Sequence, residues 1–349
     1  MTLPRSKPVL SSLSSVAVSR GVGQLSKMNR QLLIYLDQNK WIDLARAFHD
    51  RPDGNRFKSV LQKIKLAGEE GKAILPLSGT HVIETRASKD MSKRLRLSQV
   101  MSSISRGWTI APSYVITPVE LGMSVAKTFD QPLPAQPITF GRGIPFACGI
   151  TMKLHKVDGP DGSTHGQVPQ LIDESLSEAK VIEDFLCGGN EAVNLRALEK
   201  YRSGKDEIVK HQESFRAAAK SYGRAVLRRA YVAQLTLAIQ PKLTRILNRF
   251  GMGMEDFLRM GEDRLMVFFS NVPTLDVETE LAVARNEDWN RGIDSNDSAD
   301  IAFLSVAIPY CDIVVTENYW RHQAEKTKLD KKYETIVLDD LLELEELLK

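Results

Sequence analysis

The sequence predicts an α/β fold with a parallel sheet and a large, mostly helical insertion. Short apolar runs alternate with stretches of helical spacing in two places, at 31–106 and at 291–349. Nearly continuous apolar strands that alternate with helices are typical of a parallel sheet covered on both faces. We therefore expect these two segments to form one α/β core, with 107–290 inserted between them.

The first part of the core begins with the strand Leu32–Leu36. Apolar residues with helical spacing follow at 41–48 and at 57–67, and each stretch predicts a helix. A second short strand at 73–75 leads to Ser78, which is a good N-cap for a third helix. This order of strands and helices is the opening of an α/β unit.

The second part of the core repeats the pattern. Polar residues at 296–298 predict the cap of a helix over the apolar stretch 301–308, which Pro309 closes. The apolar runs 313–316 and Ile336–Leu338 predict two further buried strands, and a last helix follows the second of them.

The insertion changes character along its length. Its first part, 107–170, is rich in Pro and Gly and predicts irregular structure with a few strands. From 171 onwards the pattern becomes helical and charged, and it includes a basic stretch. Arg and Lys supply most phosphate contacts, so this stretch would suit a nucleic-acid backbone, although a solvated helix face is the more common role. The basic residues are Arg224, Arg228, Arg229, Lys242, Arg245 and Arg249, and the first four are the candidate nucleic-acid contacts.

Composition favours a cytoplasmic protein without a membrane span. Cys148, Cys187 and Cys311 are widely separated, which indicates neither a disulfide framework nor a structural zinc site. No apolar run approaches the ~20 residues that span a bilayer, so we expect no membrane partner. The net charge of +3 permits a nucleic-acid partner without requiring one.

Residues 1–30 differ from the rest because they are Ser-rich and contain no acidic residue. A disordered leader accounts for this composition, as does an extension that precedes an alternative start at Met28. An organellar transit peptide is the third interpretation.

Three carboxylates occupy positions that favour a shared site. Asp37 follows the first predicted strand directly, at the carboxyl edge where open α/β sheets bind ligands. Glu84 lies six residues after Ser78, near the start of the third predicted helix, and Asp300 lies at the start of the helix that leads into the strand 313–316. These elements would bring the three side chains to one edge of the sheet.

Clustered carboxylates repel one another and raise one another's pKa unless a cation neutralises them. Mg²⁺ or Mn²⁺ suits oxygen ligands, and the chemistry implied is hydrolysis of a phosphodiester. Taken singly, each residue also has a structural explanation: Asp37 in a turn, Glu84 on a solvated face and Asp300 near the helix dipole. For Asp297 we favour the role of N-cap, and for His81 a structural role over a phosphate contact.

At three separated places the residues resemble the PIN-domain family. The segment 33–44 resembles the family's opening strand, its first catalytic aspartate and the helix that follows. The pair Ser78 and Glu84 is similar to the family's capping serine and its glutamate six positions later. Asp300 and the segment 314–318 resemble its third acidic residue and the strand end after it.

The resemblance covers 31–100 and 291–349. It implies a PIN-like α/β/α sandwich on a parallel sheet and a divalent-metal-dependent endonuclease, usually a ribonuclease that cleaves RNA. Asp37, Glu84 and Asp300 would be the catalytic residues and would bind Mg²⁺ or Mn²⁺. Family settings include toxin–antitoxin pairs, RNA processing and phage defence.

Two features depart from the family pattern. The fourth acidic position holds Asn318, although Glu317 adjoins it, so one metal would be held less firmly or only one would be needed. The insertion 107–290 would shape substrate choice or hold a protein partner such as an antitoxin. Glu317 and Asp297 are additional candidate metal ligands, and Asn39, Thr316 and Asn318 are candidates for orienting the ligands.

Two other functions remain open from the sequence. A structure-specific DNA nuclease would use the same acidic site. A catalytically inactive nucleic-acid-binding or interaction protein would keep the fold without the chemistry.

Overall fold

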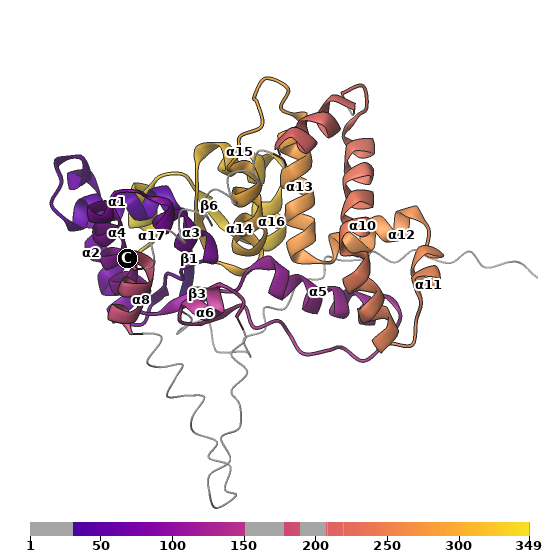
Figure 1. Ribbon diagram of the computed structural model, residues 1–349, viewed down its shortest axis with the longest axis horizontal. Helices are drawn as coiled ribbons and strands as arrows, with labels where there is room; N and C mark the ends of the chain where they lie inside the picture. The colour runs from indigo at the N-terminus through magenta and orange to yellow at the C-terminus, as the bar shows by residue number, and fades with distance from the viewer. Residues whose placement is uncertain (1–30, 151–177, 189–206, 208, 219, 349) are drawn as a thin grey trace, which may run out of the picture.

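A computed structural model describes residues 31–150, 178–188, 207, 209–218 and 220–348 of the chain (Figure 1). The predicted leader at 1–30 and two parts of the predicted insertion, 151–177 and 189–206, lie outside the described residues.

The centre of the core is a sheet of four strands in the order β2-β1-β5-β6, and every pairing within it is parallel. The strands are β1 (Leu32–Leu36), β2 (Ala73–Ile74), β5 (Ile313–Val315) and β6 (Ile336–Leu338). Segments from both ends of the chain therefore pair directly, because β1 lies beside β5. The predicted parallel sheet in an α/β fold is confirmed.

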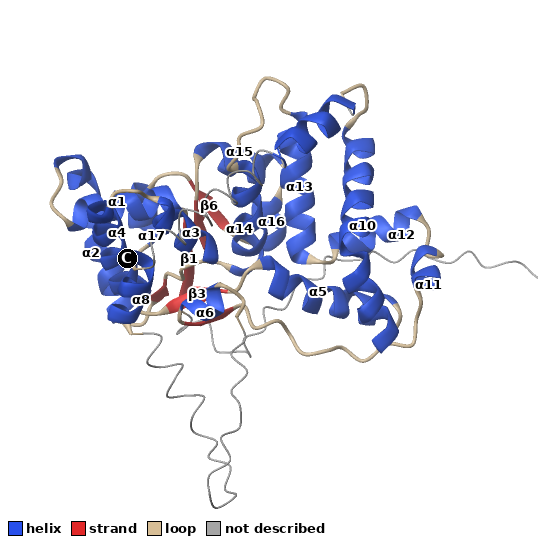
Figure 2. Ribbon diagram, in the orientation of Figure 1, coloured by secondary structure: helices blue, strands red, loops and turns tan. Residues whose placement is uncertain are grey.

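Alternate residues of the strands enter two different cores. Ile34 and Leu36 of β1 pack with Ile313 and Val315 of β5 in one core, whereas Tyr35 packs in the other with Val314. Successive side chains of a strand point to opposite faces, so this alternation means that both faces of the sheet are covered. Figure 2 shows helices on both sides of the strands.

The first core packs against helices from the start of the chain and against the last helix. These elements are α1 (Gln38–Phe48), η1 (Pro52–Phe57), α2 (Lys58–Glu69), α3 (Gly79–Ala87), α4 (Met91–Ser105) and α17 (Leu341–Leu347). The opposite core packs against helices from the second half of the chain. These are α13 (Pro273–Glu287), α14 (Asp297–Tyr310), α15 (Asn318–Lys326) and α16 (Leu329–Tyr333). Pro309 lies inside α14 and does not close it, because the helix continues to Tyr310.

The prediction of irregular structure for 107–170 is wrong for 113–128, where the chain forms the 16-residue helix α5 (Ser113–Thr128). Pro118 lies inside this helix and removes one backbone hydrogen bond. Burial of Ile116, Leu121 and Val125 on the helix face outweighs that loss.

The rest of the insertion attaches to the core through strands and helices. The strands β3 (Trp108–Ile110) and β4 (Phe140–Arg142) form a separate antiparallel sheet, and a parallel bridge between Leu77, three residues after β2, and Thr109 connects it to the core. The short helix α6 (Ile144–Ala147) follows β4, and α8 (Ala179–Cys187) packs on α3 and α4.

A separate apolar cluster joins α5 to the helices α10 (Arg224–Arg249), α11 (Met254–Leu258) and α12 (Glu262–Ser270). The helix α13 connects this cluster to the core, since it packs along α14 as well as on α10. No helix in the ranges given above is both long and apolar enough to cross a membrane.

Candidate acidic site at the carboxyl edge of the sheet

Asp37 lies where β1 ends and is the N-cap of α1. Its Oδ1 accepts a hydrogen bond from the backbone N–H of Gln38 over 2.6 Å, and its own N–H donates to the carbonyl of Val315 in β5 over 2.9 Å. Burial raises the pKa of Asp37 to about 6; the Gln38 N–H lowers it, and the negative charge of Glu317 raises it. The side chain is thus a buried carboxylate held at the carboxyl edge of the sheet.

Glu84 lies in α3, whose start is fixed by a reciprocal cap. The Ser78 hydroxyl accepts from the backbone N–H of His81, and the Ser78 N–H donates to Nδ1 of His81 over 3.0 Å. Ser78 is therefore the N-cap, as predicted. Glu84 is half-buried, and its charge contributes to the raised pKa of Tyr35.

His81 is a structural residue of this region. Its ring is almost fully buried and stacks on Tyr35 with the ring centroids 5.2 Å apart. Burial lowers the pKa of His81 to about 3, so the imidazole is neutral at physiological pH. A neutral ring that caps a helix from inside the core offers no phosphate contact.

Asp300 enters the same edge from the first turn of α14. Its Oδ2 accepts a hydrogen bond from the indole Nε1 of Trp320 over 2.9 Å. Burial raises the pKa of Asp300 to about 8, the Trp320 hydrogen bond lowers it, and the negative charges of Asp37, Glu317 and Glu84 raise it. The negative charges of all three other carboxylates therefore act on Asp300.

Glu317 follows β5 and precedes α15. It is exposed, and its Oε1 accepts a hydrogen bond from Nδ2 of Asn39 in α1 over 2.7 Å. This contact links the ends of β1 and β5 across the site. Asn318, the first residue of α15, is also exposed.

Asp300 lies within electrostatic reach of Asp37, Glu84 and Glu317, but the four carboxylates do not form a closed cage. In the part of the chain that the structure describes, no three His, Cys, Asp or Glu side chains are placed to hold a metal ion together. The closer convergence expected from the sequence is therefore not seen. Hydrogen bonds from the Gln38 backbone, Trp320 and Asn39 each draw one carboxylate towards its own neighbour.

The donor set nevertheless fits a hard divalent cation, because every candidate ligand is an oxygen. A further oxygen adjoins them: the Thr316 hydroxyl is buried, lowers the pKa of Asp37, and has no well-formed hydrogen bond within the described residues. Asp37, Glu84, Asp300 and Glu317 are the residues that could contribute oxygen ligands to such an ion, with Thr316 beside Asp37.

Asp297 has a different role. Both of its oxygens accept hydrogen bonds from the Arg291 guanidinium, over 2.8 and 2.6 Å, and one also accepts from the backbone N–H of Asp294 over 3.0 Å. Its side chain is fully buried. Asp297 is the first residue of α14 and not its N-cap, which is Asn296, so the predicted cap is wrong. The ion pair with Arg291 occupies the carboxylate that was a candidate metal ligand.

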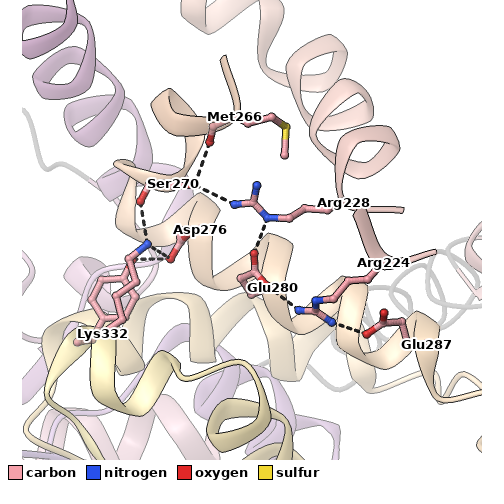
Figure 3. A network of polar contacts seen from close by, with 9 residues as sticks. Arg224, Arg228, Met266, Ser270, Asp276, Glu280, Glu287 and Lys332 are labelled. Atoms are coloured by element: carbon pink, nitrogen blue, oxygen red, sulfur yellow. Dashed lines mark hydrogen bonds and ion pairs between the residues drawn. The ribbon is translucent and has the colours of Figure 1, made fainter. Parts of the chain in front are cut away.

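Three arginines of the basic stretch of α10 form ion pairs with neighbouring helices. Arg224 pairs with Glu280 and Glu287 of α13, and Arg228 pairs with Glu280 over 2.5 Å (Figure 3). Two further members of the stretch behave differently: Arg229 pairs with Glu262 of α12, whereas Lys242 is exposed. Of the four predicted nucleic-acid contacts, three arginines therefore form intramolecular ion pairs.

Two residues that the sequence did not single out contribute to the site. Trp320 orients Asp300, and Lys40 lowers the pKa of Asp37 while its Nζ donates to the carbonyl of Asp339 over 2.6 Å. Their positions in the sequence could have indicated these roles. Lys40 lies one helical turn after Asp37, and Trp320 lies shortly after the end of β5.

In comparisons with known proteins, the chain matches no protein-family model, no curated protein and no solved structure.

Proposed function

We propose that the protein is a divalent-metal-dependent endoribonuclease with a PIN-like core. One observation carries this proposal. At the carboxyl edge of the sheet, Asp300 is half-buried, and this desolvation together with the negative charges of Asp37, Glu317 and Glu84 raises its pKa to about 8. Perturbed carboxylates that raise one another's pKa are a feature of functional sites, and a cation relieves their repulsion.

Three contacts prepare the carboxylates for a ligand. The backbone N–H of Gln38 orients Asp37, the indole of Trp320 orients Asp300, and the amide of Asn39 orients Glu317. Such partners fix the direction of a ligand's oxygen atoms and tune its affinity. When bound, Mg²⁺ or Mn²⁺ would polarise the phosphoryl oxygen and lower the pKa of an attacking water.

The order of these residues along the chain also supports the PIN-like assignment. The three segments that resemble the family end at one edge of the sheet: Asp37 after β1, Glu84 in the helix after β2, and Asp300 in the helix before β5. RNA is the substrate that the resemblance implies.

Cleavage of labelled RNA by the purified full-length chain tests the proposal. Wild-type protein is compared with Asp37→Asn and Asp300→Asn in Mn²⁺, Mg²⁺ and EDTA, with matched DNA strands alongside. Each substitution should lower metal-dependent RNA cleavage on the order of 100-fold, because it removes a charged ligand. Asp263→Asn is the control, since Asp263 is an exposed carboxylate in the first turn of α12.

Two results would overturn the proposal. Cleavage that is equal in wild type and Asp37→Asn would come from a contaminant. If wild type cleaves neither single-stranded, hairpin nor duplex RNA in either metal, the protein lacks the proposed activity. Preferential cleavage of DNA would keep the site and change the substrate.

A further inference from the structure

A surface pocket of about 520 Å³ lies between the start of α10, the end of α13 and the end of α15. Its walls include two aromatic rings, Tyr222 and Trp289, and two cationic side chains, Arg224 and Lys326. Its volume falls within the range of pockets that bind small molecules. None of these four residues belongs to the acidic site.

Both aromatic rings of the pocket face solvent. Tyr222 is 56% exposed and Trp289 is 40% exposed, whereas Trp41 and Trp320 are almost fully buried. The Trp289 ring is also held in place: the Arg216 guanidinium lies 5.0 Å from the ring centroid and donates to the backbone carbonyl of Arg291 over 2.7 Å. A fixed and exposed indole is a ready surface for stacking a planar ligand.

Lys326 supplies the pocket with a cation for an anionic ligand, whereas Arg224 is already paired with Glu280 and Glu287. The one acidic wall residue of the pocket, Glu287, is paired with Arg224 (Figure 3). Lys326 is exposed and forms no ion pair with any residue that the structure describes. Exposed aromatic rings beside cations are the combination that binds single-stranded nucleic acid, because bases stack on the rings and the cations contact phosphates.

The pocket and the acidic site lie along the same helix. The nine-residue α15 begins next to Glu317 and ends at Lys326, so it spans about 13 Å. Arg291 also connects the two sites. Its backbone carbonyl accepts from Arg216, which contacts the Trp289 ring, and its guanidinium lies 4.0 Å from the ring centroid of Tyr319, the residue before Trp320. A strand bound at the acidic site would therefore reach the pocket within a few nucleotides.

We propose that this pocket is a binding subsite for a base of single-stranded RNA, with Trp289 and Tyr222 stacking the base and Lys326 contacting a flanking phosphate. The inference rests on the proposed nuclease function and specifies that its substrate is single-stranded RNA.

Oligonucleotide binding without catalysis tests the subsite. The full-length Asp300→Asn protein is titrated in EDTA into a fluorescein-labelled 12-nucleotide RNA, and anisotropy reports affinity. In this background Trp289→Ala should weaken binding on the order of tenfold, as expected for loss of one stacked base, and Trp289→Phe should retain most of the affinity. Leu237→Ala on α10 is the matched control, because it also removes a large exposed side chain.

Charge and stacking are tested separately. Lys326→Gln should weaken binding and reduce its salt dependence, whereas Lys331→Gln, which removes an exposed lysine of α16, should do neither. Intrinsic tryptophan emission should be quenched by RNA in the Asp300→Asn protein and less so when Trp289 is replaced by Phe.

The outcomes separate the subsite from the nuclease. Wild-type cleavage of RNA together with equal binding by the Trp289→Ala and Leu237→Ala proteins would overturn the subsite and leave the nuclease standing. Tight RNA binding that Trp289→Ala weakens, without cleavage by wild type in any metal, would support the subsite and overturn the nuclease. The absence of RNA binding in EDTA would overturn the subsite.

Discussion

The indole Nε1 of Trp320 donates a hydrogen bond to Oδ2 of Asp300 over 2.9 Å. This contact lowers the pKa of Asp300, against burial and the three neighbouring carboxylates that raise it. It also fixes the direction in which the second oxygen of Asp300 faces the site. The carboxylate of Asp300 is therefore oriented by a buried aromatic residue of the next helix.

Trp320→Phe should shift the activity of the site without unfolding the protein, since most of the buried ring remains. Loss of the donor raises the pKa of Asp300 further, so the pH profile of metal-dependent RNA cleavage should move to higher pH. Cleavage at neutral pH should fall on the order of tenfold. The control is Trp41→Phe, because the buried Nε1 of Trp41 lacks a hydrogen-bond partner among the described residues. Similar profiles for both variants would contradict the role of Trp320.

The acidic site should make the metal-free protein less stable as pH rises. The pKa of Asp37 is raised to about 6 and that of Asp300 to about 8, so between pH 4 and 8 the folded state binds more protons than the unfolded state. These groups contribute stability that is present below pH 4 and is lost as pH passes 6 and then 8. Urea unfolding in EDTA should show this fall, and Asp300→Asn should flatten the part above pH 6. An identical slope in both proteins would contradict the assignment.

Breaking the Arg291–Asp297 ion pair should destabilise the fold. Arg291→Ala leaves the fully buried carboxylate of Asp297 unpaired, and we expect the free energy of unfolding to fall by about 2–4 kcal/mol. Urea denaturation measures the change. Adding Asp297→Asn to Arg291→Ala removes the unpaired charge and should restore part of the loss; a further loss of the same size would contradict this explanation.

Ser78→Ala should destabilise the first turn of α3 and thereby make the position of Glu84 less well defined. The substitution removes the cap of α3 and the hydroxyl that lies 3.2 Å from the Tyr35 hydroxyl, so stability should fall by about 1 kcal/mol. RNA cleavage should fall as well. Asp90→Ala removes the N-cap of α4, and cleavage should remain at the wild-type level in that variant. An equal loss of activity in both variants would indicate a general effect of stability.

Local signals predicted much of the fold. The strands β1 and β6 have the bounds expected from their apolar runs, and Ser78 is the N-cap that its position after β2 indicated. Asp37 lies at the carboxyl edge because that position depends only on where β1 ends. These features are set by a few neighbouring residues, so the sequence reveals them.

Features that depend on distant residues were not predictable in this way. The helix α5 forms in a segment rich in Pro and Gly because its apolar face is buried against α10 and α13. Arg228 pairs with a glutamate 52 positions later in the chain, and Trp320 donates to a carboxylate 20 positions earlier. A role for the insertion in binding a protein partner stays a prediction.

The most direct test of the account is a crystal structure of the full-length chain soaked in Mn²⁺, with anomalous scattering used to locate the ion. We predict a manganese peak in contact with the carboxylates of Asp37 and Asp300 in the wild-type protein, and its loss in Asp300→Asn. Manganese bound elsewhere, or no peak between these two carboxylates at millimolar Mn²⁺, would contradict the assignment of the acidic site as a metal centre.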